Sequence, residues 1–166
     1  MTITELNIHW IRHGYSCANI HKWIHATIHD PGLTYDGLEC SLKSAKKVPN
    51  ISYDFIFCSA LKRAMETALA MFPKDKIKKT KIKKILSVPF IGEKGFGFDN
   101  TKSNIEHLKL YFSKFSKLLD LTLHKKMKKE MNIVDIDGFF NFLNTYLENF
   151  NLKGTIDIAI VTHSHF

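Results

Sequence analysis

The stretch IDIAIVT, residues 156–162, is a continuous apolar run of the kind found in the middle of a parallel β-sheet. Three earlier stretches also have strand character: Ile3 to Ile11, Tyr53 to Cys58, and Ile82 to Val88, which lysines interrupt. Segments with helical spacing of apolar residues separate these strands. Because strands that alternate with helices build βαβ units, the sequence predicts an α/β fold, a three-layer α/β/α sandwich with a mostly parallel central sheet.

The helices are predicted from apolar spacing, from capping residues, and from the turns or prolines that follow. They are expected within Cys17 to Ile28, from a Thr34 cap to about Lys47, from a Ser59 cap to Pro73, and from Gly138 to Phe150.

The chain has 166 residues, of which 45% are hydrophobic, and this size suits one domain with a substantial core. The segment of about residues 89–135 does not follow the strand and helix rhythm. It holds three glycines and then a helical stretch rich in lysine and phenylalanine, Ile105 to Lys129. We therefore predict a single domain, residues 1–166, with an insertion or lid at about 89–135 that lies over one end of the sheet.

The formal net charge of +8 and the pI near 9.3 raise the question of nucleic-acid binding. Lysines gather in Lys74 to Lys84 and in His124 to Glu130, but no zinc-finger, helix-turn-helix or RNA-binding signature accompanies them. The sequence therefore predicts a solvated basic surface and no nucleic-acid partner. A positive field would still attract a small phosphorylated molecule.

The sequence also bears on compartment. It holds no run of about 18 apolar residues, and its N-terminus lacks the layout of a signal peptide, so the protein is expected to be soluble and cytoplasmic, with no membrane partner. Its cysteines, Cys17, Cys40 and Cys58, have no CxxC spacing and are predicted to be free thiols. The oligomeric state is left open.

Polar side chains follow three of the predicted strands. The ligands of open parallel sheets bind beyond the carboxyl ends of the strands, so we expect two histidines and two arginines to converge there. A guanidinium group can donate two parallel hydrogen bonds to the oxygens of a phosphate, and a neutral imidazole can attack phosphorus. This set of residues therefore points to phosphoryl chemistry. The residues are Arg12, His13, Ser16 and Asn19 after the first strand, Arg63 after the second, and Thr162, His163 and Ser164 after the fourth.

Four blocks of sequence, in order along the chain, carry a family resemblance. They are Arg12-His13-Gly14-x-Ser16-x-x-Asn19, Leu33-Thr34-x-x-Gly37, Ser59 to Ala68 with its Arg63-Ala64-x-x-Thr67-Ala68 motif, and Val161-Thr162-His163-Ser164. Together they resemble the histidine phosphatase superfamily, the phosphoglycerate mutase-like proteins. The blocks span nearly the whole chain.

The resemblance implies roles for these residues. His13 would be the nucleophile that forms a phosphohistidine, and its other ring nitrogen should donate to a backbone carbonyl or a similar acceptor. Arg12, Arg63 and His163 would hold the phosphoryl oxygens. The substrate-binding residues would be Ser16, Asn19 and Ser164, with Ser16 and Asn19 acting as hydrogen-bond donors.

The resemblance also implies a general acid after the third strand, where Glu93 is the matching carboxyl group. To donate a proton near neutral pH, Glu93 needs a pKa raised by desolvation or by a nearby phosphate. Glu66 and Asp99 are the alternatives. We expect Glu66 to orient or cap within its helix motif, and Asp99 lies farther along a loop rich in glycine.

The predicted function is a phosphohydrolase for a phosphate monoester, on a small phosphorylated substrate or a phosphoprotein. A phosphoglycerate mutase-type phosphotransferase and a catalytically silent module that binds a phosphorylated ligand are the alternatives. No cofactor and no metal are expected, because the site has no clustered acidic residues. His21, His25 and His29 recur every four residues, but no carboxylate or cysteine completes a metal site there.

The chain departs from the family at its C-terminus. It ends at Phe166, directly after the fourth block, where members of the family continue through a further helix and sheet-edge structure. We therefore expect C-terminal elements of the fold to be missing and the sheet near His163 to be less well covered.

Overall fold

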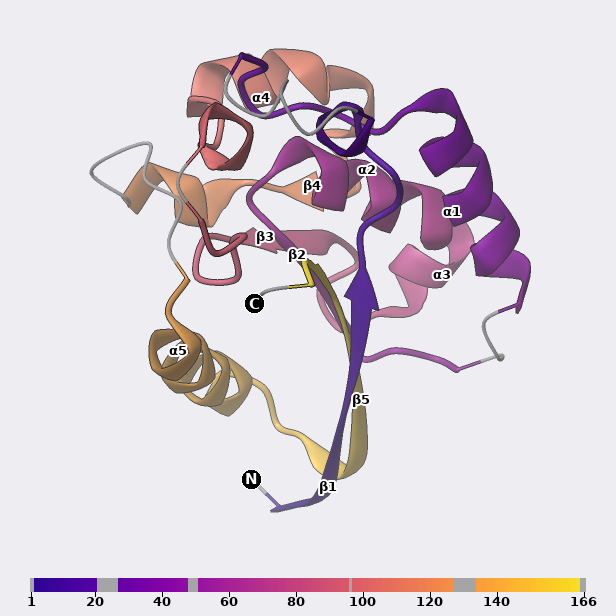
Figure 1. The fold of residues 1–166 in the computed structure, drawn as a ribbon. Helices are drawn as coiled ribbons and strands as arrows, with labels where there is room; N and C mark the ends of the chain where they lie inside the picture. Colours follow the sequence, from indigo (N-terminus) through magenta and orange to yellow (C-terminus); the bar gives the residue numbers. More distant parts are fainter. Residues whose placement is uncertain (1, 21–26, 48–50, 96, 127–133, 165–166) are drawn as a thin grey trace.

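A parallel sheet of five strands forms the centre of the molecule (Figure 1). In the computed structural model, the described residues are 2–20, 27–47, 51–95, 97–126 and 134–164. The strand order is β1-β5-β2-β3-β4, and every neighbouring pair is parallel. The last strand therefore lies between the first two, and the interior position that its apolar run predicted is confirmed. The strands are β1 (Thr2–Arg12), β2 (Phe55–Ser59), β3 (Ile85–Val88), β4 (Leu119–Asp120) and β5 (Lys153–Thr162).

Helices flank the sheet, and the predicted α/β class is confirmed. On one side lie α1, α2 and α3, on the other lies α5, and α4 lies beyond the carboxyl end of the strands (Figure 1). No helix in the described ranges combines the length and the apolar character needed to cross a membrane. The helices are α1 (Tyr35–Lys47), α2 (Lys62–Met71), α3 (Lys74–Lys79), α4 (Ile105–Tyr111) and α5 (Ile136–Glu148).

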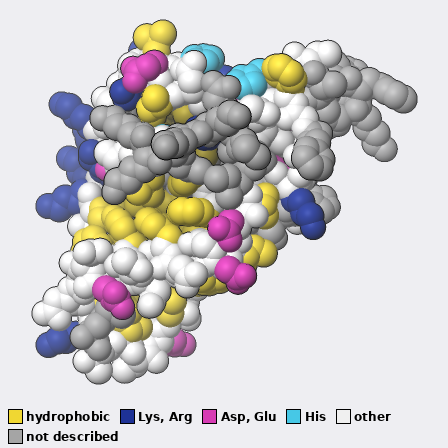
Figure 2. All heavy atoms as spheres, turned by 90° about the vertical axis from the view of Figure 1, so that its left-hand side faces the viewer, with side chains coloured by type: hydrophobic (Ala, Val, Ile, Leu, Met, Phe, Trp, Pro, Cys, Tyr) yellow, Lys and Arg dark blue, Asp and Glu magenta, His cyan; other side chains and the backbone are white. Residues whose placement is uncertain are grey.

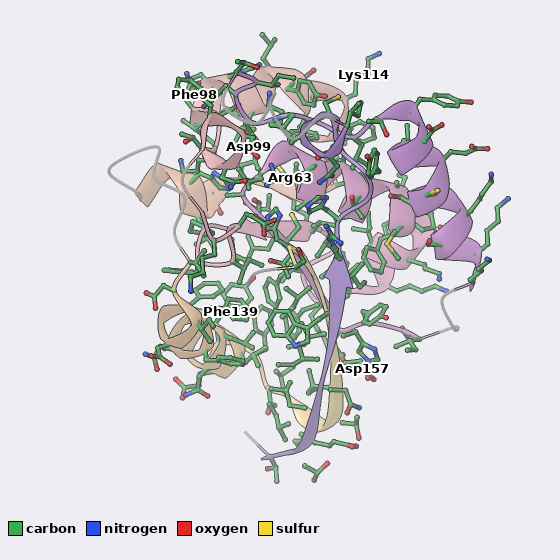
Figure 3. All side chains as sticks on the ribbon, in the orientation of Figure 1. Arg63, Phe98, Asp99, Lys114, Phe139 and Asp157 are labelled. Carbon is green, nitrogen blue, oxygen red and sulfur yellow. The ribbon has the colours of Figure 1, made fainter. Side chains whose placement is uncertain are left out.

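The alternation of side chains along the strands builds two cores. Ile56 and Cys58 of β2 face α2, whereas Phe55 and Phe57 of the same strand face α5, and all four are buried. Phe139 lies on the side of α5 that faces the sheet (Figure 3) and is fully buried. Burial of each such side chain contributes about 1.5–3 kcal/mol. Hydrophobic packing on both faces therefore holds the strand ends in place.

The α5 face of the sheet is the less covered one. Among the described residues, α5 is the only α-helix that contributes side chains to the core on this face, and Figure 2 shows hydrophobic side chains gathered there. Trp10, Ile136 and Phe140 are 45%, 47% and 43% exposed.

The loop after β1 packs closely against the start of α1. Thr34 caps this helix as predicted, because its Oγ1 accepts a hydrogen bond from the Gly37 amide (2.9 Å). The Thr34 amide donates to the carbonyl of Tyr15 (2.9 Å). A Cβ atom on Gly37 would lie only 1.9 Å from that same carbonyl oxygen. Glycine at this position therefore allows the loop that follows His13 to reach the helix.

We expect Gly37→Ala to lower the free energy of unfolding by about 2–4 kcal/mol, because the backbone of Tyr15 would have to move away. Urea unfolding followed by circular dichroism measures the change. Ser44→Ala, at an exposed position of the same helix, should shift it by no more than about 0.5 kcal/mol. A Gly37→Ala protein as stable as the wild type would contradict the close approach.

Two predicted element starts are wrong. Ser59 does not cap the second helix: α2 begins at Lys62, whose amide donates to Asp30 Oδ1 (2.9 Å). A carboxylate from a distant loop thus satisfies the helix start, and Ser59 is left for another contact. The third strand begins at Ile85 and not at Ile82, because Lys83 has a φ of 55°, which is incompatible with a strand.

The segment of residues 89–135 also differs from its prediction. The expected continuous helix from Ile105 to Lys129 is wrong: α4 ends at Tyr111, and Leu119 pairs with Ile85 as part of the edge strand β4. Burial of Leu119, which is 4% exposed, favours this pairing over a further helical turn. Residues 127–133 lie outside the described part, and the lid role of the segment stays a prediction.

Candidate active site

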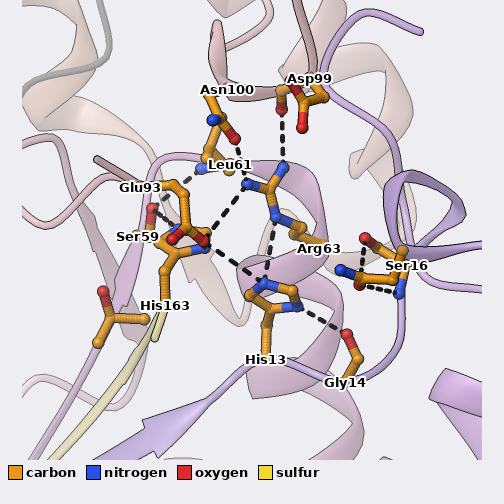
Figure 4. Close-up of polar contacts among 12 residues, drawn as sticks. His13, Gly14, Ser16, Ser59, Leu61, Arg63, Glu93, Asp99, Asn100 and His163 are labelled. Atoms are coloured by element: carbon orange, nitrogen blue, oxygen red, sulfur yellow. Dashed lines mark hydrogen bonds and ion pairs between the residues drawn. The ribbon is translucent and has the colours of Figure 1, made fainter. Parts of the chain in front are cut away.

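The carboxyl ends of β1 and β5 bring two histidines side by side. Arg12 pairs with Thr162 in the sheet, and the His13 amide donates to the Thr162 carbonyl (2.9 Å). The next residue on each strand is a histidine, so the rings of His13 and His163 lie 4.9 Å apart between centroids. Arg63, in the first turn of α2, reaches the same point, with its Nε 3.3 Å from His13 Nε2 (Figure 4).

These groups border a polar cavity of about 340 Å³. His163 does not line the cavity itself but contacts Glu93, which does. The other predicted site residues all line the cavity. The lining comprises Arg12, His13, Ser16, Asn19, Arg63, Glu93 and Ser164, together with Ala18, Lys94, Asp99 and Asn100.

His13 is held as a neutral imidazole with one nitrogen directed to the site. Its Nδ1 lies 2.6 Å from the Gly14 carbonyl, which can only accept, so Nδ1 carries the proton. Its Nε2 then accepts a hydrogen bond from Arg63 Nε. Burial, and next the charges of His163 and Arg63, lower the pKa of His13 to about 3. The lone pair needed for nucleophilic attack is therefore on Nε2.

The environment of His163 favours its neutral form, and its two close polar contacts indicate which nitrogen carries the proton. Burial lowers its pKa, although the contact with Glu93 acts in the opposite direction. Ser59 Oγ lies 2.9 Å from Nε2, and Glu93 Oε2 lies 3.1 Å from Nδ1. Because an ionised carboxylate only accepts, Nδ1 carries the proton and Nε2 accepts from Ser59. His163 thus directs an N–H group toward the carboxylate of Glu93.

Arg63 supplies permanent positive charge deep in the site. The residue is 2% exposed, and burial lowers its pKa, yet a guanidinium stays protonated in proteins. Its Nη1 donates to the carbonyl of Asp99 (2.7 Å) and its Nη2 to Asn100 Oδ1 (2.8 Å). Figure 3 shows Arg63 and Asp99 close together at the carboxyl end of the sheet.

Glu93 lies among three nitrogen-bearing side chains. Its Oε2 is 3.1 Å from His163, 3.9 Å from Arg63 and 3.9 Å from His13. Burial raises the pKa of Glu93, but the hydrogen bond and charge of His163, then Arg63 and His13, outweigh it and hold the pKa at about 2. Desolvation alone therefore does not give Glu93 the expected raised pKa, and a rise caused by a nearby phosphate stays a prediction.

Ser16 and Asn19 hydrogen-bond mainly to each other. Asn19 Oδ1 accepts from the Ser16 amide (2.9 Å) and from the Ser16 hydroxyl (2.8 Å). The Ser16 hydroxyl proton is thus used within the loop, and the expectation that Ser16 donates to a ligand does not fit this geometry. The amide nitrogen of Asn19 is the donor that this pair can offer to the cavity.

The sequence analysis missed supporting residues that only become adjacent in the fold. Asp30 is fully buried, and its carboxylate accepts from the amides of Lys62 (2.9 Å) and Ser103 (2.8 Å). Thr67 Oγ1 accepts from the Gly14 amide (2.9 Å), which joins α2 to the His13 loop. Thr67 belongs to a recognised sequence block, but Asp30 had only its turn context as a signal.

The two alternative general acids are placed differently. Glu66 accepts hydrogen bonds from the Leu33 amide (2.5 Å) and the Tyr111 hydroxyl (2.5 Å), and it does not line the cavity. It therefore orients the chain around it, as expected. Asp99 does line the cavity, and it contacts Arg63 through its backbone carbonyl.

The site suits an anion better than a metal ion. His13, Glu93 and His163 offer ligand atoms within 4.8 Å of one another. However, Arg63 contacts two of these groups directly, so a divalent cation would bind beside a buried positive charge. Of the alternative histidine set, His21 and His25 lie outside the described residues, and the ring of His29 packs against Phe98 at 5.8 Å.

Comparisons with known proteins give a sequence match over part of the chain and a shared fold. Residues 8–86 match the sequence model of the histidine phosphatase superfamily (branch 1), and no curated protein matches the chain. Among solved structures, the chain is similar to an ecdysone phosphate phosphatase from Bombix mori, with 18% identity, a TM-score of 0.56, and coverage of 94% of this chain and 72% of that chain.

Two further solved structures show the same fold. The alpha-ribazole phosphatase from Shigella flexneri has 17% identity and a TM-score of 0.51, with coverage of 94% of this chain and 73% of that chain. The phosphoserine phosphatase from Entamoeba histolytica has 20% identity and a TM-score of 0.50, with coverage of 96% and 75%. Residues 8–86 of the chain therefore match the histidine phosphatase superfamily (branch 1) by sequence, and nearly the whole chain shares its fold with these three solved structures.

Proposed function

We propose that this protein is a phosphohydrolase that transfers the phosphoryl group of a phosphate monoester to water through a phosphohistidine on His13. One observation carries the proposal. The unprotonated Nε2 of a neutral His13 lies next to the guanidinium of Arg63 and the carboxyl group of Glu93, beside a single polar cavity. A nucleophile, a fixed positive charge and a proton carrier are the parts that this chemistry needs.

The reaction takes place in two displacements at phosphorus. In the first, the Nε2 lone pair of His13 forms the N–P bond while the bond from phosphorus to the ester oxygen breaks, and Glu93 gives its proton to that oxygen. In the second, a water oxygen attacks phosphorus, the N–P bond breaks, and the Glu93 carboxylate takes the proton of the water. Arg63, Arg12 and the Nδ1–H group of His163 would stabilise the phosphoryl oxygens throughout.

The low pKa of Glu93 sets a condition on the first step. Its carboxylate is held ionised by contacts with His163 and Arg63, and a phosphoryl dianion would compete for both groups. The added negative charge would also repel the carboxylate directly, which raises the pKa of Glu93. We therefore propose that the substrate itself makes Glu93 a proton donor.

The substrate we propose is a small phosphorylated molecule or a phosphorylated side chain of a protein. Arg12, Lys94 and Arg63 line the cavity and give it the positive charge such a group requires. We propose the cytoplasm as the compartment, because all three cysteines are free thiols, which a reducing environment preserves.

The direct test is brief exposure to a ³²P-labelled aryl phosphate, acid-labile labelling of the chain, and peptide mapping. We expect the label on His13 and release of inorganic phosphate. The same protein incubated with 3-phosphoglycerate should give no isomerised product. Formation of 2-phosphoglycerate would favour the mutase instead, and binding without label or phosphate release would favour a silent binding module.

Replacement of the proton carrier should depend on the leaving group. We expect Glu93→Gln to lower the labelling rate with an alkyl phosphate by about 100-fold, because the alkoxide must be protonated as it leaves. For a nitrophenyl phosphate, whose leaving group is stable as an anion, the loss of labelling rate should stay within about threefold. Pre-steady-state labelling with both substrates measures this difference.

The matched control for this prediction is Glu39→Gln. Glu39 is exposed and pairs with Lys43 on α1 (2.9 Å), away from the cavity, so both substrates should keep wild-type rates. Equal losses for the two substrates in Glu93→Gln would show that Glu93 does not protonate the leaving oxygen.

A further inference from the structure

The guanidinium of Arg63 is held on three sides by groups of the protein. A guanidinium has five N–H groups. In this structure Nη1 donates to the Asp99 carbonyl, Nη2 to Asn100 Oδ1, and Nε to His13 Nε2 (Figure 4). The first two acceptors belong to one short turn, Phe98–Asn100, and the third is the proposed nucleophile.

We propose that Asn100 is a positioning residue that holds Arg63 with its Nε–H group on the lone pair of His13 Nε2, so that a phosphoryl oxygen must accept this N–H group before His13 can attack. The effect on attack by His13 rests on the proposed function, whereas the position of Arg63 on His13 can be measured in the protein without a substrate. Arg63 thereby acts on both reactants. Its Nε–H group donates to the lone pair of the nucleophile, and the guanidinium would bind the phosphoryl group that the nucleophile attacks.

The carboxylate of Asp30 fixes the backbone on both sides of this contact, next to Arg63 and next to the turn that carries Asn100. Asp30 accepts hydrogen bonds from the amide of Lys62, directly before Arg63, and from the amide of Ser103, just after the turn. The Asp30 amide donates to the carbonyl of Phe98 (3.2 Å). One buried residue therefore fixes both partners of the contact between Arg63 and Asn100, which makes their relative position well defined.

The chemistry of the two anchors suits this role. A carbonyl and a side-chain amide oxygen are neutral, so they orient the guanidinium without cancelling its charge. Of the carboxylates in the described ranges, that of Glu93 comes nearest to Arg63, at 3.9 Å, well beyond the 2.8 Å contact with Asn100. Arg63 is thus oriented by Asn100 and Asp99 and keeps its positive charge for a phosphoryl group.

The test compares Asn100→Ala with the wild type by NMR, following the imidazole of His13 in the ligand-free protein and with inorganic phosphate. Loss of the anchor lets the guanidinium move away from Nε2, so the pKa of His13 should rise by about one unit. The other groups that face His13, namely His163, Glu93 and the Gly14 carbonyl, are unchanged. Phosphate should bind about tenfold more weakly.

Asn104→Ala is the matched control, because Asn104 caps α4 through the His107 amide (2.8 Å) and does not line the cavity. Both measurements should stay at wild-type values in this variant. A His13 pKa and a phosphate affinity that are unchanged in Asn100→Ala would overturn the inference.

The readout also separates this inference from the proposed function. A raised His13 pKa in Asn100→Ala supports the positioning role even if the wild type hydrolyses no ester. Conversely, labelling of His13 by an aryl phosphate with no response to Asn100→Ala would keep the proposed function and remove Asn100 from it.

Discussion

His13→Ala is expected to lower phosphate release from an aryl phosphate by at least about 10³-fold and to abolish acid-labile labelling, because it removes the Nε2 lone pair that forms the N–P bond. Among the described residues, His163 has the nearest imidazole ring, but its Nδ1 carries a proton that faces Glu93 and its one free lone pair, on Nε2, accepts from Ser59. The measurement is initial-rate kinetics together with ³²P labelling.

His107→Ala is the matched control for this loss. His107 is exposed on α4 and does not line the cavity, so its removal should leave the rate within about twofold of the wild type. A phosphatase rate in His13→Ala equal to that of the wild type would exclude His13 from the mechanism.

Stability against pH shows independently whether His13 is neutral in the fold. Its pKa is lowered from an ordinary 6.5 to about 3, so between these values the unfolded chain binds a proton that the folded chain does not. The wild type should therefore lose stability as the pH falls from about 6.5 toward 3. His13→Ala lacks this contribution, and its stability should fall less steeply over the same window.

Arg63→Lys is expected to lower kcat/KM by about 100-fold, and Arg63→Ala by about 10³-fold. A lysine keeps the charge, but one ammonium group cannot reach His13, the Asp99 carbonyl and Asn100 at the same time. The planar guanidinium is therefore needed for its shape as well as for its charge. Steady-state kinetics with the aryl phosphate give both values.

Arg12→Lys is the control for charge at the same cavity. Arg12 is exposed, and no hydrogen bond or ion pair links it to another side chain in the described part of the chain. The flexible side chain of a lysine at this position can still reach a bound phosphoryl group, so kcat/KM should fall by no more than about tenfold. If Arg63→Lys stays within about threefold of the wild type, the geometric role of Arg63 is wrong.

Much of the fold could be predicted because its signals are local. The apolar run of β5, the Thr34 cap and the amphipathic pattern of α5 each depend on neighbours a few residues away. The errors arose where a distant residue replaced a local one. Ser59 looked like a cap, but Asp30 occupies the start of α2 and frees Ser59 for His163.

The same distinction applies to the site. The residues at the strand ends could be named from the sequence, because parallel strands deliver their carboxyl ends to one edge. The ionisation of Glu93 could not, since it depends on distances to His163 and Arg63 that no sequence separation indicates. Asn100 and Asp30 were missed for the same reason.

The sequence by itself determined the α/β class, the interior position of β5, and the set of histidine and arginine side chains at the carboxyl edge, because the spacing of apolar residues and the alternation of strands with helices are encoded locally. The tertiary structure alone decided which proton each imidazole carries, the charge of Glu93, and the support of Arg63 by Asn100. Those properties depend on burial and on contacts of about 3 Å between residues far apart in the chain, and only the folded chain sets such distances.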